Sequence, residues 1–325
     1  MTSPAAVPDT AAGSGQAEAA SVSRRPFRVR KAAELSLLIG PSFILFVLFV
    51  FVPLIAASYY SFFKWNGFTP VNKFIGFDNY VRILSDPVFR RGIFNNVFVA
   101  TLSILIQLPL SIAIALLLSG RIRGRTFLRV LVFTPYVLSE AVTAVIWLLY
   151  LQPEGPFDAM LRGMGLGSVV HLWLADTNLV MWTIFAVATW KYIGFGIILF
   201  LAGLQGTPQE VREAAMIDGA NPWQVTRFIT LPLLAPTIRI WIFLSVVGSM
   251  QLFDLVWIMT LGGPVGASTT MATYLIDRGF RRLQFGYGSA IAILLFIICF
   301  VFALFYQRYA LRRDIEGAQT GAVGG

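Results

Sequence analysis

The stretch that decides the fold is Glu213-Ala214-Ala215-Met216-Ile217-Asp218-Gly219, which is followed by Ile229-Thr230-Leu231-Pro232. It lies between two long apolar segments, where a bland polar linker would be enough to join them. Instead, its alanines, glutamate and methionine favour a helix, and its glycine favours the end of one. The sequence therefore predicts a short helical element in a loop between two apolar segments.

The residues before and after this stretch mark the ends of that first helix. Thr207 can cap it, Pro208 suits its first position, and Glu210 completes a capping box. The helix is expected to run through Asp218 and to stop at Gly219, because glycine tolerates a left-handed backbone.

A second short helix is predicted to begin at Asn221-Pro222, which again places a capping residue before a proline. Leu231-Pro232 and Pro236 are expected to break the helical pattern before the next apolar segment, because proline lacks a backbone N–H. The loop is thus predicted to form two short helices with a glycine bend between them.

The composition points to lipid as the solvent of this chain. Of its 325 residues, 57% are hydrophobic and 13% are charged, and the mean hydropathy is +0.74. A soluble domain carries about 25% charged residues. Six apolar segments are long enough to cross a bilayer, which requires about 20 residues. They are Leu35–Tyr59, Asn95–Leu118, Val130–Leu151, Leu179–Leu204, Ile238–Leu261 and Tyr287–Tyr306. The predicted fold is an all-α membrane protein with six transmembrane helices, and the helical loop lies between the fourth and the fifth.

The two ends of the chain differ from this apolar region. Residues 1–31 begin with a stretch rich in Ala, Gly, Ser and Pro and end in a basic cluster, which predicts a disordered tail rather than a signal peptide. Residues 32–310 are predicted to form the transmembrane domain, and residues 311–325 a second flexible tail.

The distribution of Lys and Arg predicts the orientation in the membrane. With the N-terminus inside, the inner segments hold fifteen of these residues and the outer loops nine. This excess predicts cytoplasmic N- and C-termini and a cytoplasmic helical loop. The net charge of +9 lies mainly beside apolar spans, which fits membrane-flanking charge better than nucleic-acid binding.

Several kinds of chemistry are missing from the sequence. One cysteine, Cys299, and one histidine, His171, exclude an internal disulfide framework and a His/Cys metal cluster. A phosphate-binding P-loop requires a lysine after a glycine, and none of the four lysines follows one. We therefore expect no catalytic residues, no metal site and no cofactor in this chain.

The opening stretch resembles the EAA signature of the permease subunits of bacterial ABC importers: Glu-Ala-Ala, three residues, Gly, nine residues and Ile-x-Leu-Pro. Every one of these positions matches. Four further segments resemble the family, so that the resemblance covers roughly residues 35–310. They are Gly76-Phe77-Asp78-Asn79-Tyr80, Gly262-Gly263-Pro264, Thr269-Thr270 and Gly286-Tyr287-Gly288-Ser289-Ala290. The resemblance is closest to the sugar-importing branch, which includes maltose and glycerol-3-phosphate systems.

This resemblance implies a machine of several subunits in the bacterial cytoplasmic (inner) membrane. A cytosolic ATPase dimer would bind ATP and Mg, a second homologous permease would form a heterodimer with this chain, and an extracytoplasmic solute-binding protein would deliver the sugar. The chain itself would be a transport subunit and not an enzyme. Its EAA loop would be the coupling helix pair that contacts the ATPase. The residues expected at that contact are Glu213, Ala214, Ala215, Asp218 and Gly219.

The side chains of the loop also favour docking on their own terms. Val211, Ala214, Ala215 and Asp218 share one face at helical spacing, and small alanines let another protein approach closely. Glu213 offers a carboxylate to a basic partner group. The alternative is an amphipathic helix lying on the inner leaflet, which predicts bulky apolar residues and a basic polar face.

Three ionisable residues fall within the predicted spans: Glu140, Lys191 and Asp254. A charge at the bilayer centre costs at least about 2.5 kcal/mol, so such residues usually face a cavity or a partner. They indicate a polar pathway between the third, fourth and fifth spans, or structural pairing of Lys191 with one of the two carboxylates. The two interpretations are compatible.

Aromatic and polar residues near these charges suit a sugar, which needs flat aromatic faces for its C–H surfaces and hydrogen-bonding groups for its hydroxyls. Taken singly, each aromatic residue is explained as well by packing. The resemblance favours the pathway, because maltose-type permeases hold pocket residues on the spans before the EAA loop and before Gly-Gly-Pro. The residues added to the predicted pathway are Trp190, Tyr192, Phe195, Ser245, Gly248, Ser249 and Gln251. Lys191 leaves an acidic or phosphorylated substrate open.

The expected function is that of a permease subunit of a binding-protein-dependent ABC importer, which forms half of the transmembrane pathway for a mono- or oligosaccharide. The alternative is an ion-coupled secondary transporter of a polar solute that uses Glu140 and Asp254 as proton or cation sites. That alternative predicts inverted repeats, which the sequence does not show, and it leaves the EAA loop unexplained. A membrane enzyme would need a catalytic cluster that the chain lacks.

Overall fold

The computed structural model describes residues 25–120, 123–206 and 208–311. The predicted tail segments 1–24 and 312–325 and the predicted cap Thr207 lie outside these residues. The described chain is almost entirely helical, as predicted, with an isolated antiparallel β-bridge between Phe63 and Phe74. It divides after Pro53 into two compact units, which are described separately.

The first unit is an apolar helical run. It comprises α1 (Arg25–Phe46), the π-helical turn η1 (Val47–Phe51) and the start of α2 (Val52–Tyr60), which continues into the second unit. The segment Ser36–Tyr60 has the length and hydropathy to cross a membrane. The predicted boundary at residue 31 between tail and transmembrane domain lies inside α1.

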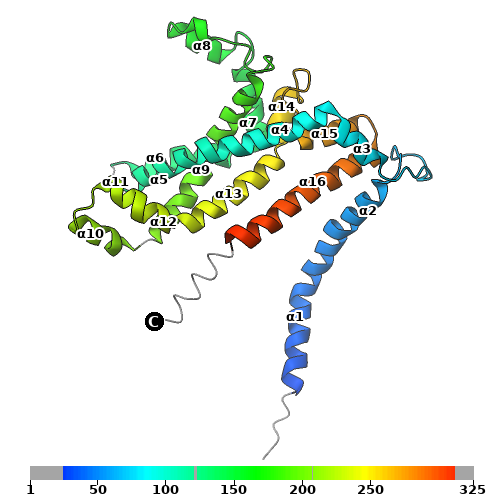
Figure 1. Cartoon of the computed structure of the whole chain (residues 1–325), viewed down its shortest axis with the longest axis horizontal. Helices are drawn as coiled ribbons and strands as arrows, with labels where there is room; N and C mark the ends of the chain where they lie inside the picture. Colours follow the sequence, from blue (N-terminus) through cyan, green and yellow to red (C-terminus); the bar gives the residue numbers. More distant parts are fainter. Residues whose placement is uncertain (1–24, 121–122, 207, 312–325) are drawn as a thin grey trace, which may run out of the picture. The chain divides into compact units, whose positions relative to one another are not determined.

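The second unit holds the remaining helices (Figure 1). Up to the helical loop, these are α3 (Asp78–Ser85), α4 (Pro87–Leu102), the π-helical turn η2 (Ser103–Gln107), α5 (Leu108–Ser119), α6 (Arg125–Val137), α7 (Glu140–Tyr150), α8 (Pro156–Gly163), the 3-10 turn η3 (Gly167–Val169) and α9 (Val180–Gln205). After it come α10 (Gln209–Ile217), α11 (Pro222–Val225), the π-helical turn η4 (Thr226–Thr230), α12 (Leu231–Leu233), α13 (Ala235–Met250), α14 (Asp254–Thr260), α15 (Met271–Ile276), the π-helical turn η5 (Asp277–Arg281), α16 (Phe285–Tyr306) and the π-helical turn η6 (Gln307–Leu311).

Within the described residues, five helical segments are long and apolar enough to cross a membrane, and a sixth results if α6 and α7 count as one bent span. The five are Ser36–Tyr60, Pro87–Ser119, Val180–Gln205, Ala235–Thr260 and Phe285–Ala310. Each of the six predicted spans thus corresponds to one of these segments or to the bent pair.

The predicted third span, Val130–Leu151, is not a continuous helix. Helices α6 and α7 meet at an angle of 95°. Leu138 has an extended backbone, and the Ser139 hydroxyl accepts a hydrogen bond from the Val142 N–H at 3.2 Å. Ser139 therefore caps a new helix within a segment whose apolar pattern predicted a single one.

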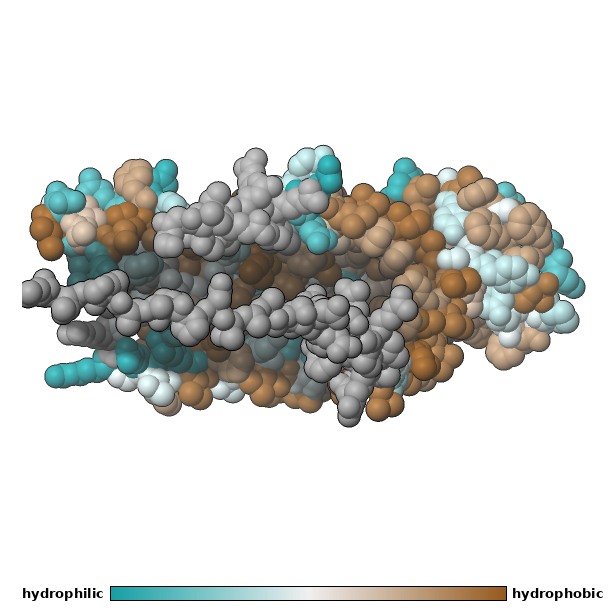
Figure 2. Space-filling view, turned by 90° about the horizontal axis from the view of Figure 1, so that it is seen from below, coloured by the Kyte–Doolittle hydropathy of each residue, from teal (hydrophilic) through white to brown (hydrophobic). Residues whose placement is uncertain are grey.

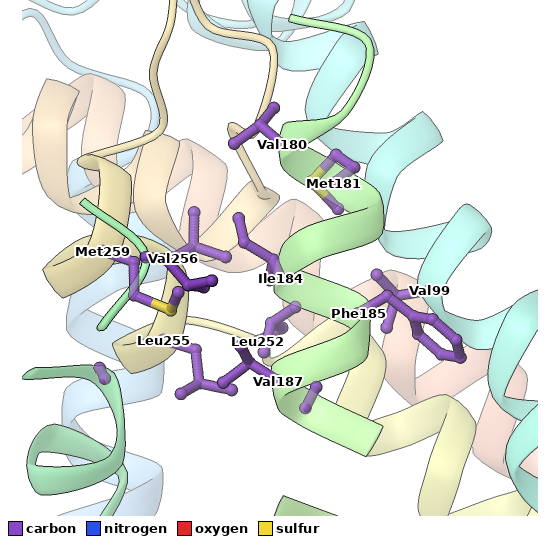
Figure 3. Packing of buried hydrophobic residues seen from close by; sticks show 13 residues of the cluster. Val99, Val180, Met181, Ile184, Phe185, Val187, Leu252, Leu255, Val256 and Met259 are labelled. Carbon is purple, nitrogen blue, oxygen red and sulfur yellow. The ribbon is translucent and has the colours of Figure 1, made fainter. Parts of the chain in front are cut away.

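Helix α9 forms the centre of the second unit. One buried cluster joins it to α7 and α14, with Ile184 of α9 facing Leu255 and Val256 of α14 (Figure 3). A second cluster joins α9 to α5 and α13. Gly194 allows α6 to approach closely, because a Cβ there would lie 2.4 Å from the Val132 carbonyl oxygen. The position of α9 brings α5, α6, α7, α13 and α14 around one centre.

Apolar side chains also cover large areas of the surface (Figure 2). On α16, for example, the exposed residues Phe296, Phe300 and Leu304 follow one another at a spacing of four. An apolar stripe of this kind on an outer helix suits contact with lipid or with another membrane helix.

The loop between α9 and α13 forms the two predicted short helices. Helix α10 ends at Ile217, and Gly219 adopts a left-handed backbone with φ of +88°. Helix α11 begins with a capping box between Asn221 and Gln224. The two helices and the glycine bend are confirmed, although Pro208 precedes the first helical residue instead of occupying it.

The predicted break before the fifth span is present but short. From α11 the chain is helical through η4 and α12, and Leu234 forms a turn between the end of α12 and the start of α13. In the π-helical turn η4, the Leu231 N–H bonds to the Thr226 carbonyl, five residues earlier. Pro232 and Pro236 are the second residues of α12 and α13, in the first turn, where a missing N–H is tolerated.

Candidate functional site

A cavity of about 440 Å³ lies at the centre of the second unit, between α4, η2, α6, α7, α9, α13 and α14. Its walls combine aromatic, hydroxyl, amide and carboxyl side chains. The lining residues are Val99, Ser103, Gln107, Tyr136, Glu140, Ala188, Tyr192, Phe195, Trp241, Leu244, Ser245, Gly248, Ser249, Gln251, Leu252 and Asp254. A volume of this size is within the range of small-molecule sites.

Most of the pathway residues expected from the sequence lie around this cavity. They are Glu140, Tyr192, Phe195, Ser245, Gly248, Ser249, Gln251 and Asp254. Trp190 and Lys191 do not line it. The structure thus brings together residues of four separate helices that the sequence could only place on neighbouring spans.

The two carboxylates stand where two apolar spans are interrupted. Glu140 is the first residue of α7, directly after the bend that follows α6, and Asp254 is the first residue of α14, after α13 has ended at Met250. Tyr192 donates a hydrogen bond from its hydroxyl to Glu140, and Asp254 is close enough to hydrogen-bond with the same group. The N-terminus of a helix favours negative charge, which suits both positions.

Lys191 is turned away from the cavity and is only 3% exposed. Its ammonium group donates a hydrogen bond to the Leu138 carbonyl oxygen at 2.5 Å. Leu138 is the extended residue at the bend between α6 and α7. The sequence suggested a carboxylate as the structural partner, but this bond is made to backbone, and it ties α9 to the bend that positions Glu140.

Trp190 also lies outside the cavity. Its side chain is 38% exposed and packs edge-on against Trp147 of α7, with ring centroids 5.4 Å apart. Neighbouring residues of a helix point in different directions, so Tyr192 and Trp190 face different surroundings although they are two positions apart.

Two polar residues of the second span, Ser103 and Gln107, were not predicted from the sequence. Both line the cavity, and each is 5% exposed. Neither side chain forms a hydrogen bond within the part of the chain that the structure describes. They are the ends of the π-helical turn η2, which places residues four apart near one face. The sequence did offer a signal for this position: two polar residues four apart within the otherwise apolar run Leu102–Leu110.

Aromatic rings provide much of the remaining wall. Tyr136 stacks on Phe195 with ring centroids 5.2 Å apart and an interplanar angle of 24°. Trp241 of α13 is 4% exposed and lines the same cavity. Tyr136 and Trp241 were also missed by the sequence analysis, because an aromatic residue in an apolar span carries no sign of the face it occupies.

A buried hydrogen-bond network holds the break between α13 and α14 in place. Asn96 of α4 donates to the Ser249 carbonyl at 2.5 Å and accepts from the Met271 N–H at 2.9 Å. Thr270 donates to the Leu252 carbonyl at 2.8 Å. These bonds occupy backbone groups that the interrupted helix leaves free, so Gln251 and Asp254 keep their positions at the cavity.

The predicted coupling residues all lie at the surface of the helical loop, with Ala215 half-buried and the others exposed. The same loop carries large exposed apolar side chains, which were not predicted from the sequence. Ile217 is 86% exposed, and Trp223 and Phe228 are each 68% exposed. An exposed apolar group of this kind on a short helix pair suits a protein partner, although bulky apolar residues are also what the leaflet alternative requires.

Comparisons with known proteins agree with this architecture. Residues 107–315 match the family model described as the binding-protein-dependent transport system inner membrane component. The chain is 33% identical over 281 residues to the trehalose/maltose transport system permease protein MalF of Thermococcus litoralis, covering 86% of this chain and 94% of that protein. It is 32% identical over 278 residues to the diacetylchitobiose uptake system permease protein NgcF of Streptomyces coelicolor, covering 82% of this chain and 78% of that protein.

Among solved structures, the chain is similar to one from a bacterial ABC transporter involved in the import of the acidic polysaccharide alginate. The TM-score is 0.76 and the identity 25%, and the match covers 88% of this chain and 99% of the other. The bundle of apolar helices with a central polar cavity therefore defines a multi-pass membrane permease. Given the family match and these relatives, the chain belongs to the inner-membrane components of binding-protein-dependent transport systems, as a permease subunit of an ABC importer.

Proposed function

We propose that this permease forms half of the transmembrane pathway for a mono- or oligosaccharide and that the cavity around Tyr192 lies on that pathway. The observation that carries the proposal is a wall that combines aromatic rings with the polar side chains of Ser103 and Gln107, which have no hydrogen-bond partner among the described residues. A sugar ring presents apolar C–H faces and many hydroxyls, so it needs both kinds of group. The sugar-transport relatives support the same substrate class.

The energy for transport comes from a partner in this proposal. A cytosolic ATPase dimer binds ATP and Mg and contacts α10 and α11, so that its cycle moves this chain and a second homologous permease between two states. The exposed Ile217, Trp223 and Phe228 support such a contact, because they give the loop an apolar surface. An extracytoplasmic binding protein delivers the sugar, and both termini of this chain lie in the cytoplasm.

An ion-coupled secondary transporter is the weaker alternative. It is favoured by the two carboxylates at the cavity, Glu140 and Asp254, which could hold a proton or a cation. It gives no role to the helix pair α10–α11, and the relatives are permeases of ABC systems. A catalytically inactive partner ATPase distinguishes the two functions. It should abolish uptake by an ABC importer and leave uptake by an ion-coupled transporter unchanged.

The cavity is tested by filling it. Gly248 lines it, and a Cβ at this position meets no atom within 4 Å, so Gly248→Leu should fold and occupy the space that the sugar needs. We expect uptake of the transported sugar, identified from a radiolabelled panel in a strain lacking the native gene, to fall at least about tenfold.

The matched control is Gly163→Leu. Gly163 is exposed on α8, and a Cβ there also meets nothing within 4 Å, so the same side chain is added outside the cavity. Normal uptake by both variants at equal membrane levels would show that the cavity is not on the pathway.

A further inference from the structure

The ionisable carboxyl groups at the cavity are Glu140 and Asp254. Among the described residues, no Lys, Arg or His lines it. The described wall thus offers no guanidinium or ammonium group that could hold a carboxylate or a phosphate in the usual way. An anionic sugar entering this space would face two carboxyl groups and no cationic partner among the described residues.

The nearest cation does not change this. Lys191 is close enough to attract Glu140, but its ammonium group is buried and donates to the Leu138 carbonyl oxygen at 2.5 Å. To bind a ligand, the Lys191 ammonium group would have to break that hydrogen bond, and the bend between α6 and α7 would lose its link to α9. Lys191 therefore offsets part of the negative charge of Glu140 without offering a binding group to a substrate.

The remaining polar groups suit hydroxyls. Ser103 and Gln107 are each 5% exposed, line the cavity and have no partner within the described residues. A buried amide or hydroxyl without a partner is costly, so these groups are expected to gain a ligand or water as partner. Together they can donate and accept, which matches sugar hydroxyls, because a hydroxyl also does both.

We propose that this cavity selects sugars without anionic groups and that Glu140 and Asp254 impose the selection by facing an O–H or ammonium donor of the ligand. The substrate class is thus neutral or amine-bearing sugars, and uronates and phosphate esters are excluded. This inference rests on the proposed function, but the sign of charge in the cavity can be measured independently of transport.

The test uses charged thiol reagents on the full chain in membranes. Gly248→Cys, in a Cys299→Ala background, places a single thiol in the cavity, where the added side chain has room. Methanethiosulfonates carrying an ethylammonium or an ethylsulfonate group are similar in size and opposite in charge. We measure the ratio of their reaction rates, each corrected for its rate with a free thiol.

We expect the ammonium reagent to be favoured at least about tenfold at Gly248→Cys, because a cleft lined by one sign of charge concentrates the opposite ion. Glu140→Gln together with Asp254→Asn should bring the ratio close to one. Gly163→Cys, an exposed site on α8, is the control at which those two substitutions should leave the ratio unchanged.

Equal rates, or a faster sulfonate reagent, in the otherwise wild-type cavity would overturn the proposal. If neither reagent modifies Gly248→Cys, the same measurement is made at Ser245→Cys, and failure at both sites would overturn it too, because polar ligands then cannot enter.

A second measurement separates this inference from the proposed function. Uptake that depends on this chain is compared for maltose, a glucosamine disaccharide and digalacturonate in the complete importer. Import of digalacturonate at the highest rate would overturn the selection while leaving sugar import intact. No uptake of any sugar would count against the proposed function, while the reagent ratio would still decide the charge of the cavity.

Discussion

Asp86 shows how much structure one carboxylate can organise in this protein. It caps α4 by accepting from the Val88 N–H at 2.8 Å, and it accepts a hydrogen bond from the Tyr274 hydroxyl of α15 at 2.6 Å. Arg278 of η5 forms an ion pair with it at 3.3 Å. One residue before the second apolar span thus joins the start of α4 to α15 and η5, which follow more than 160 residues later.

These contacts set the protonation of the group. Burial alone would raise the pKa of Asp86, but the hydrogen bonds from Tyr274 and Val88 and the charge of Arg278 together hold that pKa below its ordinary value. Burial and the bond to Asp86 raise the pKa of Tyr274, so its hydroxyl remains a donor. The ionised carboxylate therefore stabilises the folded state above the unfolded pKa of about 3.9, and this contribution is lost as the pH falls through the lower folded pKa.

A prediction at this scale concerns Asp86→Asn. We expect it to lower the free energy of unfolding by about 1–3 kcal/mol at neutral pH, because it weakens charge-assisted bonds to Tyr274 and Arg278. It should also flatten the loss of stability of the wild-type chain below about pH 4. Thermal unfolding of the detergent-solubilised chain between pH 7 and pH 3 measures both effects.

Asp277→Asn provides the comparison. Asp277 pairs with Arg281 and Arg282, which are more than half exposed, so its removal should cost at most about 1 kcal/mol. Equal losses for the two variants, or an unchanged acid dependence in Asp86→Asn, would contradict the role assigned to Asp86.

At the scale of elements, interruptions of helices are what make the site. The bend after α6, the break after α13 and the π-helical turn η2 each lie within an apolar span. Each places a polar residue, respectively Glu140, Asp254 and Gln107, at the cavity. Backbone groups released at such points need partners, and Lys191 and Asn96 supply them.

The helix pair α10–α11 depends on a similar local feature. Gly219 has φ of +88°, and a Cβ there would meet no neighbouring atom within 4 Å, so only the backbone conformation disfavours a side chain. We expect Gly219→Ala to cost about 1 kcal/mol locally. Faster hydrogen exchange in residues 209–225 and weaker association with the ATPase would be the observable results.

Gly206→Ala is the control for this prediction. Gly206 follows α9 with φ of −78°, and a Cβ there makes only ordinary contact with the Gly203 carbonyl oxygen. Alanine should be accepted at this position without strain. If both variants show the same hydrogen exchange and the same ATPase association, the left-handed bend is not needed for the shape of the loop.

At the scale of the whole molecule, the helix pair α10–α11 and the cavity are separate parts of one permease. Glu213→Lys should therefore reduce ATPase association and sugar uptake at least about tenfold without preventing membrane insertion, because it reverses a charge on the surface proposed to face a basic partner group. Pull-down of the ATPase and uptake, at equal membrane levels, measure this.

Glu210→Lys tests whether position matters more than net charge. Glu210 lies in the first turn of α10 and is exposed. Its replacement by Lys therefore changes the charge of α10 by the same amount as Glu213→Lys. We expect a smaller effect than at Glu213. Unchanged uptake and unchanged pull-down with Glu213→Lys would remove the docking assignment.

The sequence by itself determined the apolar spans, the two short helices and the family, because span length, capping residues and the glycine stop are local properties of the chain. It also supplied most of the polar residues of the cavity, since a charge or a serine cluster inside an apolar span is conspicuous. Only the tertiary structure decided which of them face one another. The bend at Ser139 and the break before Asp254 turn Glu140 and Asp254 toward a common space, while Lys191 is taken up by a backbone carbonyl. Apolar periodicity carries no information about such interruptions, because their stability comes from hydrogen bonds between residues far apart in the chain.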